Sequence, residues 1–260
     1  MALRKTRERI TGGTIDVSYA GDTTAEPILF LHGGGTYPPR YCASLERLAQ
    51  NYYLIAPHLR AASLRDQANI AGDIAAALIG DAYHVIGHSY GAAAALTLAA
   101  SRTGPSDLIY VNGPLEGPRQ LRQLLRGSRE IAHKVSARLP RNKIPQHLFM
   151  RTWEFIQYLR LQSHHGREFL NDVRRFTPNE IACPIPTLFL HTAHDEFFPL
   201  TVTAHNTIST THPSAQFRII NNQDLTHTWF YDHPERVWTE VHRFYTQGTT
   251  QQTRCFKHKG

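Results

Sequence analysis

The residues whose types and spacing most clearly suggest a catalytic role are 87–91, which read Gly-His-Ser-Tyr-Gly. They stand between an apolar run, 83–86, and an alanine-rich stretch, 92–100, that is typical of a helix. A serine in a tight turn between a strand and a helix has its hydroxyl raised above the sheet, where it can attack a substrate. Glycines suit that turn because side chains at those two positions would strike the strand or the helix. The pattern therefore predicts Ser89 as a nucleophile.

A serine hydroxyl is a weak nucleophile at neutral pH, so it needs a base to take its proton and a carboxylate to orient that base. His227 is the predicted base, because it lies in a polar loop after the last apolar run and before the final helical pattern. Asp195 is the predicted acid, in the loop after the apolar run 187–191. The order along the chain is then Ser, Asp, His. Glu196 and Glu116 are the alternatives for the acid.

A glycine loop offers backbone amides for the oxyanion of a tetrahedral intermediate. Residues 32–35 read His-Gly-Gly-Gly and directly follow the apolar run 29–31. Backbone N–H groups aimed at the oxyanion are often the largest single term in acyl-transfer catalysis. We predict that the two donors are the amides of Gly34 and of Tyr90, the residue after the nucleophile. Four other histidines are interpreted as loop or strand neighbours of the site: His32, His88, His191 and His194.

Apolar runs alternate with helical patterns along most of the chain. Continuous apolarity is typical of strands covered on both faces, and alternation with helices favours a parallel sheet between two helical layers. We therefore predict an α/β fold with a doubly wound, mostly parallel sheet. The predicted strands are 15–19, 27–31, 52–56, 83–86, 107–111, 187–191 and 216–220. The predicted helices are 42–50, 64–78, 91–101 and 235–245.

A long stretch after the fifth predicted strand breaks this alternation. Residues 115–179 are largely helical in pattern and are predicted to form an inserted helical cap, so that the core comprises 1–114 and 180–247. The polar tail, 248–260, has no periodicity and is expected to be disordered. Four apolar residues of the cap are candidates for lining an acyl pocket: Leu124, Phe149, Trp153 and Phe155.

The positive charge of the chain is concentrated in the cap. The chain has a net charge of +7, and residues 115–178 alone hold 13 Lys and Arg against 5 Asp and Glu. A basic cap would raise the local concentration of an anionic substrate or carrier, although a solvated helix face rich in arginine explains the same charge. No basic motif interleaved with aromatic residues is present, so nucleic acid is not an expected partner.

The composition indicates one cytoplasmic domain. With 260 residues, of which 41% are hydrophobic, the chain can bury a large core. No apolar stretch is long enough to cross a bilayer, and the charged first residues do not look like a signal peptide. Three widely spaced cysteines fit a reducing compartment better than a disulfide framework or a zinc site. We expect no metal and no other cofactor, and the sequence leaves the oligomeric state open.

These residues together resemble the α/β-hydrolase fold superfamily, in its single-domain form with a helical cap. Where this family often has glycine, the chain has Ala193 and, before the base, Thr226. The resemblance implies hydrolysis of an ester, thioester or related acyl bond through a covalent acyl-serine. It also supports the triad assignments residue by residue. The segments that carry it are 32–33, 57–60, 87–91, Asp195, the His227 loop and 232–234.

The sequence thus predicts a serine hydrolase that cleaves a carboxyl ester or thioester of a small or medium acyl group. The basic cap favours acyl chains borne on an anionic carrier such as acyl carrier protein or coenzyme A. The same triad also serves carbon–carbon bond hydrolysis, perhydrolysis, cyanohydrin cleavage and acyl transfer, and a receptor with slow turnover is another alternative. Epoxide and haloalkane hydrolysis are disfavoured, because those relatives carry aspartate at the position of Ser89.

Overall fold

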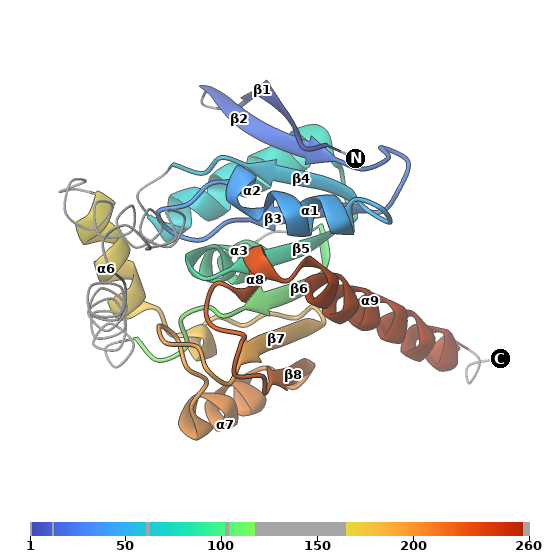
Figure 1. Ribbon diagram of the computed structural model, residues 1–260. Helices are drawn as coiled ribbons and strands as arrows, with labels where there is room; N and C mark the ends of the chain where they lie inside the picture. Colours follow the sequence, from blue (N-terminus) through green and yellow to red (C-terminus); the bar gives the residue numbers. More distant parts are fainter. Residues whose placement is uncertain (1, 12, 61–62, 102–103, 118–164, 257–260) are drawn as a thin grey trace, which may run out of the picture.

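The computed structural model describes residues 2–11, 13–60, 63–101, 104–117 and 165–256, and a sheet of eight strands forms its centre (Figure 1). The strands lie side by side in the order β1-β2-β4-β3-β5-β6-β7-β8. The first two pair antiparallel, β2 is antiparallel to β4, and all remaining neighbours are parallel. This confirms the predicted mostly parallel sheet. The strands are β1 (Arg4–Ile10), β2 (Gly13–Ala20), β3 (Pro27–Leu31), β4 (Tyr53–Pro57), β5 (Tyr83–His88), β6 (Pro105–Val111), β7 (Thr187–Thr192) and β8 (Ala215–Ile220).

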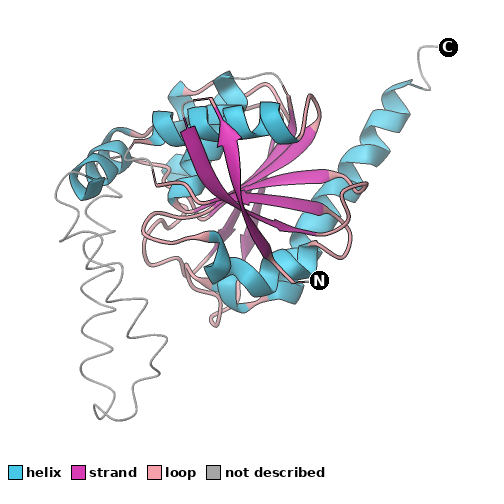
Figure 2. Ribbon diagram, turned by 90° about the horizontal axis from the view of Figure 1, so that it is seen from above, coloured by secondary structure: helices cyan, strands magenta, loops and turns pink. Residues whose placement is uncertain are grey.

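Helices cover both faces of the sheet, as Figures 1 and 2 show. One hydrophobic cluster joins the sheet to α2, α3, α6 and α7, and a second joins its other face to α1, α8 and α9. The described helices are α1 (Cys42–Leu48), α2 (Leu64–Leu78), α3 (Tyr90–Ser101), α6 (His165–Arg175), α7 (Val202–Thr211), α8 (Trp229–Asp232) and α9 (Pro234–Phe256), with short 3-10 helices η1 (Pro38–Tyr41) and η2 (Pro178–Glu180).

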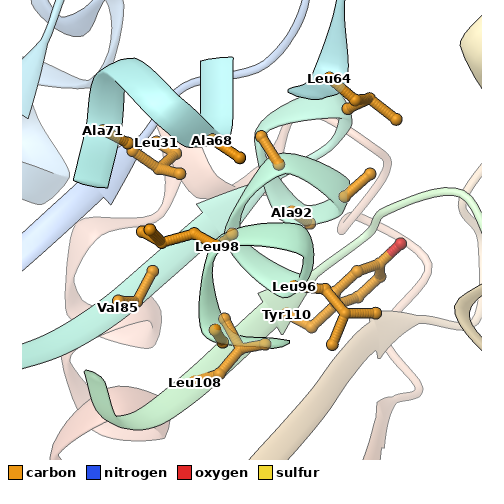
Figure 3. Close-up of a cluster of buried hydrophobic side chains, with 14 of the residues drawn as sticks. Leu31, Leu64, Ala68, Ala71, Val85, Ala92, Leu96, Leu98, Leu108 and Tyr110 are labelled. Carbon is orange, nitrogen blue, oxygen red and sulfur yellow. The ribbon is translucent and has the colours of Figure 1, made fainter. Parts of the chain in front are cut away.

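The central strands are largely apolar because successive side chains point to opposite faces that are both covered by helices. In β3, Leu29 and Leu31 belong to the first cluster, whereas Ile28 and Phe30 belong to the second. Figure 3 shows the first cluster, in which leucines of α3 lie over Val85 of β5 and neighbouring strand residues. The sheet and its two helical layers confirm the predicted fold class.

Helix α2 begins where the sequence predicts, because its first turn is capped. The Ser63 hydroxyl oxygen accepts a hydrogen bond from the backbone N–H of Asp66. The Ser63 hydroxyl also lies 2.7 Å from the Asp66 carboxylate. These contacts satisfy a backbone donor that the first turn of a helix otherwise leaves without an intrahelical partner.

The charged N-terminal segment is a strand that the sequence pattern did not reveal. Lys5 and Arg7 of β1 contact the Asp16 carboxylate of β2 at 2.8 and 3.4 Å. Most of β1 is exposed, so no apolar run marks it. Charged side chains are common on edge strands, where they discourage pairing with another chain. Helices α7 and α8 are likewise additions to the predicted elements.

The C-terminal helix is longer than the sequence predicts. Helix α9 continues to Phe256, so residues 248–256 are helical where the sequence pattern indicated a disordered tail. A helix propagates through backbone hydrogen bonds, and its last turns need no apolar face. Figure 2 shows this end of α9 extending away from the sheet.

The structure describes the two ends of the predicted cap, at 115–117 and 165–179, and both lie between β6 and β7 in the chain. These ends are in contact, because a side-chain carbon on Gly117 would lie only 2.7 Å from the Arg174 carbonyl oxygen. Among the described residues, no helix is both long and apolar enough to span a membrane. Four predicted pocket residues lie outside the described residues: Leu124, Phe149, Trp153 and Phe155.

Candidate active site

Ser89 occupies a sharp turn between β5 and α3. Its φ of 59° is in the left-handed region, which costs a residue with a side chain about 1–3 kcal/mol. The turn is held by the neighbouring strand, because the Ser89 N–H donates to the Val111 carbonyl at 2.8 Å. A side-chain carbon on Gly91 would lie 2.3 Å from the Leu31 carbonyl oxygen, and one on Gly87 would meet the backbone of α3 at 2.4 Å. The two glycines are therefore required by close backbone approach.

The structure brings Ser89, His227 and Asp195 together at the carboxyl ends of the parallel strands. The His227 Nε2 atom lies 3.0 Å from the Ser89 hydroxyl oxygen. The His227 Nδ1 atom lies 3.0 Å from both carboxylate oxygens of Asp195. Asp195 is held in turn, since its Oδ1 atom accepts the backbone N–H groups of Phe197 and Phe198 at 2.8 Å each.

Burial and the attraction between His227 and Asp195 act in opposite directions on the pKa of each group. Burial alone would lower the pKa of His227, but the Asp195 carboxylate outweighs it and holds that pKa above its usual 6.5. Burial would raise the pKa of Asp195, but the charge of His227 and the Phe198 N–H hold it below 3.8. Asp195 therefore stays ionised and keeps a proton on Nδ1 of His227. In the neutral ring, Nε2 is then free to accept a proton from Ser89.

Glu196 and Glu116, the alternative acids, bind groups other than the imidazole ring of His227. The Glu196 carboxylate accepts the backbone N–H of His227 at 3.0 Å, so it holds the loop of the histidine. The Glu116 carboxylate accepts the hydroxyl of Thr201 at 2.8 Å. Among the described carboxylates, it is Asp195 that binds the imidazole ring of His227.

The glycine loop after β3 lies against the serine turn. A side-chain carbon on Gly33 would lie 3.1 Å from the Ser89 Cβ atom, and one on Gly34 would lie 3.4 Å from the Tyr90 Cβ atom. Gly34 and Tyr90, the two predicted oxyanion donors, are therefore neighbours, and the residue before Gly34 lies against Ser89.

The orientation of the Gly33–Gly34 peptide is fixed by three donors, the first of which is the Thr36 backbone N–H at 3.3 Å from the Gly33 carbonyl oxygen. The Gly33 carbonyl accepts from the Thr36 hydroxyl at 2.8 Å and from His32 Nδ1 at 2.9 Å. His32 has its proton on Nδ1, because its Nε2 atom accepts the N–H of Leu59 at 3.0 Å. In a trans peptide the C=O and N–H point in opposite directions, so the Gly34 N–H points away from His32 and Thr36.

A buried chain of hydrogen bonds connects this loop to the histidine loop. The Gly33 N–H donates to the Tyr41 hydroxyl at 2.8 Å, and that hydroxyl lies 3.0 Å from His88 Nδ1. The His88 Nε2 atom lies 3.0 Å from the His227 carbonyl oxygen. Because a carbonyl only accepts, Nε2 of His88 carries the proton and its Nδ1 accepts from Tyr41. Burial, followed by the charge of His227, lowers the pKa of His88 to about 3, so the ring is neutral.

The sequence predicts His88 only as a neighbour of the site. Its position before Ser89 was visible, but its partners, Tyr41 and the backbone of His227, are distant in the chain and left no sequence signal. His191 is buried in β7, where burial above all lowers its pKa to about 4, and His194 is exposed. Within the described part of the chain, no group of three or more His, Cys, Asp or Glu could hold a metal ion.

The sequence matches a known family over most of its length. Residues 28–240 match the family described as "Alpha/beta hydrolase family". A search of curated protein sequences finds no match to this chain.

Solved structures share the same fold. A membrane phospholipase A, described as a bacterial virulence factor, has a TM-score of 0.75 and 17% identity, covering 95% of this chain and 86% of its own. A thermophilic esterase from Thermogutta terrifontis has a TM-score of 0.69 and 19% identity, covering 94% of this chain and 98% of its own. A thioesterase domain from the curacin biosynthetic pathway has a TM-score of 0.65 and 16% identity, and the match covers 93% of this chain and 99% of that domain.

Proposed function

The chain belongs to the alpha/beta hydrolase family, and within it we propose a serine hydrolase that cleaves carboxyl esters or thioesters of a small or medium acyl group. The observation that carries the proposal is the line of contacts from the Ser89 hydroxyl through His227 to the buried Asp195 carboxylate. This arrangement provides a nucleophile, its base and the group that fixes the tautomer of the base.

In the first half of the reaction, the Ser89 oxygen attacks the acyl carbonyl carbon while Nε2 of His227 takes the hydroxyl proton. The carbonyl oxygen becomes an oxyanion, which the N–H groups of Gly34 and Tyr90 bind. The oxyanion then reforms the carbonyl and expels the alcohol or thiol, which receives the proton from His227. The product is an acyl ester on Ser89.

In the second half, water takes the place of the alcohol. His227 removes a proton from the water as it attacks the acyl carbon, and the same two amides bind the second oxyanion. Collapse of this intermediate breaks the bond to Ser89, which recovers its proton from His227. Asp195 remains ionised throughout and stabilises the imidazolium in both halves.

Two further observations support an acyl substrate: the solved proteins that share the fold, and the charge of the segment 115–178. Solved proteins of the same fold include a phospholipase A, an esterase and a thioesterase domain. The net positive charge of residues 115–178 favours an acyl group carried on an anionic carrier, such as acyl carrier protein or coenzyme A.

The proposal is tested by turnover of p-nitrophenyl esters, acyl-CoAs and acyl carrier protein thioesters of increasing chain length. The wild type is compared with Ser89→Ala. A matched control is Ser18→Ala, because the Ser18 hydroxyl also lies 2.8 Å from a histidine nitrogen, that of His58. We expect activity to disappear in Ser89→Ala and to persist in Ser18→Ala. A wild type inert on the whole panel, although fluorophosphonate labels Ser89, would favour the receptor alternative.

The carrier is tested separately by charge reversal. Replacing Arg122, Arg126 and Arg129 with glutamate should raise the KM for carrier-bound substrates and leave the KM for neutral p-nitrophenyl esters unchanged. An equal rise for both kinds of substrate would refute the carrier and leave the hydrolase intact.

A further inference from the structure

Helix α6, at the end of the segment between β6 and β7, contacts both residues that we propose as oxyanion donors. The Phe169 ring packs on the Tyr90 ring, with 4.8 Å between their centroids. A side-chain carbon on Gly34 would lie 2.7 Å from the Phe169 ring. Phe169 is only 2% exposed, so this contact is part of the core.

Asp172 lies one turn further along α6 and binds Tyr90 at its other end. The Tyr90 hydroxyl donates to the Asp172 Oδ2 atom at 2.6 Å. The same oxygen accepts the backbone N–H of Leu64, the first residue of α2, at 2.9 Å. Helix α2 therefore fixes the carboxylate that holds Tyr90, and three helices meet at one oxygen.

Tyr90 is thus held at three points, which restrain its side chain and its backbone. Its backbone begins α3, its ring lies against Phe169, and its hydroxyl bonds to a carboxylate. A hydrogen bond to an ionised acceptor is about twice as strong as a neutral one. Oxyanion donors must be held in place before the reaction, because they stabilise charge only where it develops.

We propose that Asp172 is a positioning residue for the hydrolysis, which acts through the Tyr90 hydroxyl to hold the Tyr90 N–H toward the oxyanion. This inference rests on the proposed function. It makes α6 a part of the catalytic machinery.

Two substitutions remove the hydrogen bond between the Tyr90 hydroxyl and the Asp172 carboxylate, and a third preserves it. Tyr90→Phe keeps the ring and the backbone N–H and loses only the hydroxyl. Asp172→Ala removes the acceptor. Asp172→Asn keeps one acceptor oxygen, and since both bonds end on the same oxygen, a single amide oxygen can still accept them.

Tyr110→Phe is the matched control for loss of a buried tyrosine hydroxyl. The Tyr110 side chain is fully buried, and its hydroxyl donates to the Pro114 carbonyl, outside the serine turn. Its loss should reduce stability in the same way as Tyr90→Phe without affecting the oxyanion donors.

The experiment measures the rate at which a fluorophosphonate labels Ser89, because phosphonylation also develops negative charge on an oxygen beside the serine. It also measures the inhibition constant of a trifluoromethyl ketone, which forms an oxyanion on Ser89. Displacing one donor by a fraction of an ångström should slow labelling about 10- to 100-fold. We expect that loss for Tyr90→Phe and Asp172→Ala, a smaller one for Asp172→Asn, and none for Tyr110→Phe.

The ketone distinguishes positioning from instability. Its inhibition constant should rise by the same factor as labelling slows, while the KM for esters changes little. Wild-type labelling rates in Tyr90→Phe, or a loss equal to that of Tyr110→Phe, would overturn the inference and leave the hydrolase intact. A wild-type protein that neither turns over esters nor is labelled would refute the proposed function, and the inference with it.

Discussion

Replacing Asp195 by asparagine should abolish most of the activity by placing a proton on the wrong nitrogen of His227. The Oδ1 atom of Asp195 accepts two backbone N–H groups, so the asparagine carbonyl must take that place. The NH2 group then takes the place of Oδ2, 3.0 Å from Nδ1 of His227. The carbonyl oxygen also lies 3.0 Å from Nδ1 but already accepts two backbone N–H groups, so the NH2 group makes Nδ1 the acceptor and leaves the proton on Nε2, which faces Ser89.

The magnitude follows from this tautomer. A histidine with its proton on Nε2 cannot accept the hydroxyl proton of Ser89, and the expected loss in kcat is about 10⁴-fold. At 1.36 kcal/mol for each factor of ten, this corresponds to about 5.4 kcal/mol of transition-state stabilisation. The fold should persist, because asparagine has nearly the shape of aspartate and keeps the two backbone contacts.

The assay is steady-state hydrolysis of the best p-nitrophenyl ester near pH 8, with circular dichroism as a check on the fold. Asp224→Asn is the control, because Asp224 is exposed and lies three residues before His227. We expect that control to retain wild-type activity. A loss of less than tenfold in Asp195→Asn would refute the reasoning and return Glu196 to consideration as the acid.

Three further predictions concern pH, the buried network and the serine turn. The ratio kcat/KM should fall as pH drops through the pKa of His227, which lies above 6.5 in the folded protein, because the protonated ring cannot accept a proton. A pH–rate profile whose acidic midpoint lies below 6.5 would contradict this. His88→Leu should cost stability and activity, because it removes the side-chain donor of the buried His227 carbonyl at about 1–3 kcal/mol, whereas the Tyr41 hydroxyl keeps the Tyr231 hydroxyl at 3.2 Å. Urea unfolding should show a smaller loss for His88→Gln, and equal losses would contradict the network. Gly91→Ala should destabilise by about 3 kcal/mol, because its new carbon meets the Leu31 carbonyl at 2.3 Å; an unchanged unfolding midpoint would show that this contact is not limiting.

The central strands that the sequence predicts are buried on both faces, whereas the predicted edge strand β8 is partly exposed and is marked by Phe217, Ile219 and Ile220. The predicted run 27–31 coincides with β3, where side chains enter both hydrophobic clusters. Strand β1 has no such signal, because it lies at the edge of the sheet and its side chains are mostly charged and exposed. An edge strand whose side chains are mostly charged, as in β1, has no apolar pattern and cannot be found from that pattern alone.

The loops of the candidate site were predictable, but the contacts that hold them were not. Parallel strands end at one edge of the sheet, so loops after β3, β5, β7 and β8 must approach one another there. The bonds from Tyr41 to His88 and from Tyr90 to Asp172 join residues 47 and 82 positions apart. Polar side chains such as these have no periodicity, and their partners are determined only when the helices dock on the sheet.

The central claim is that Ser89 forms a covalent acyl intermediate, and peptide mass spectrometry after rapid acid quench tests it most directly. The protein is mixed with an excess of p-nitrophenyl ester, stopped within the first turnovers and digested. We predict that the peptide containing Ser89 gains the mass of the acyl group and that Ser89→Ala shows no such gain. Stable acylation of another residue, or rapid hydrolysis by Ser89→Ala, would contradict the account.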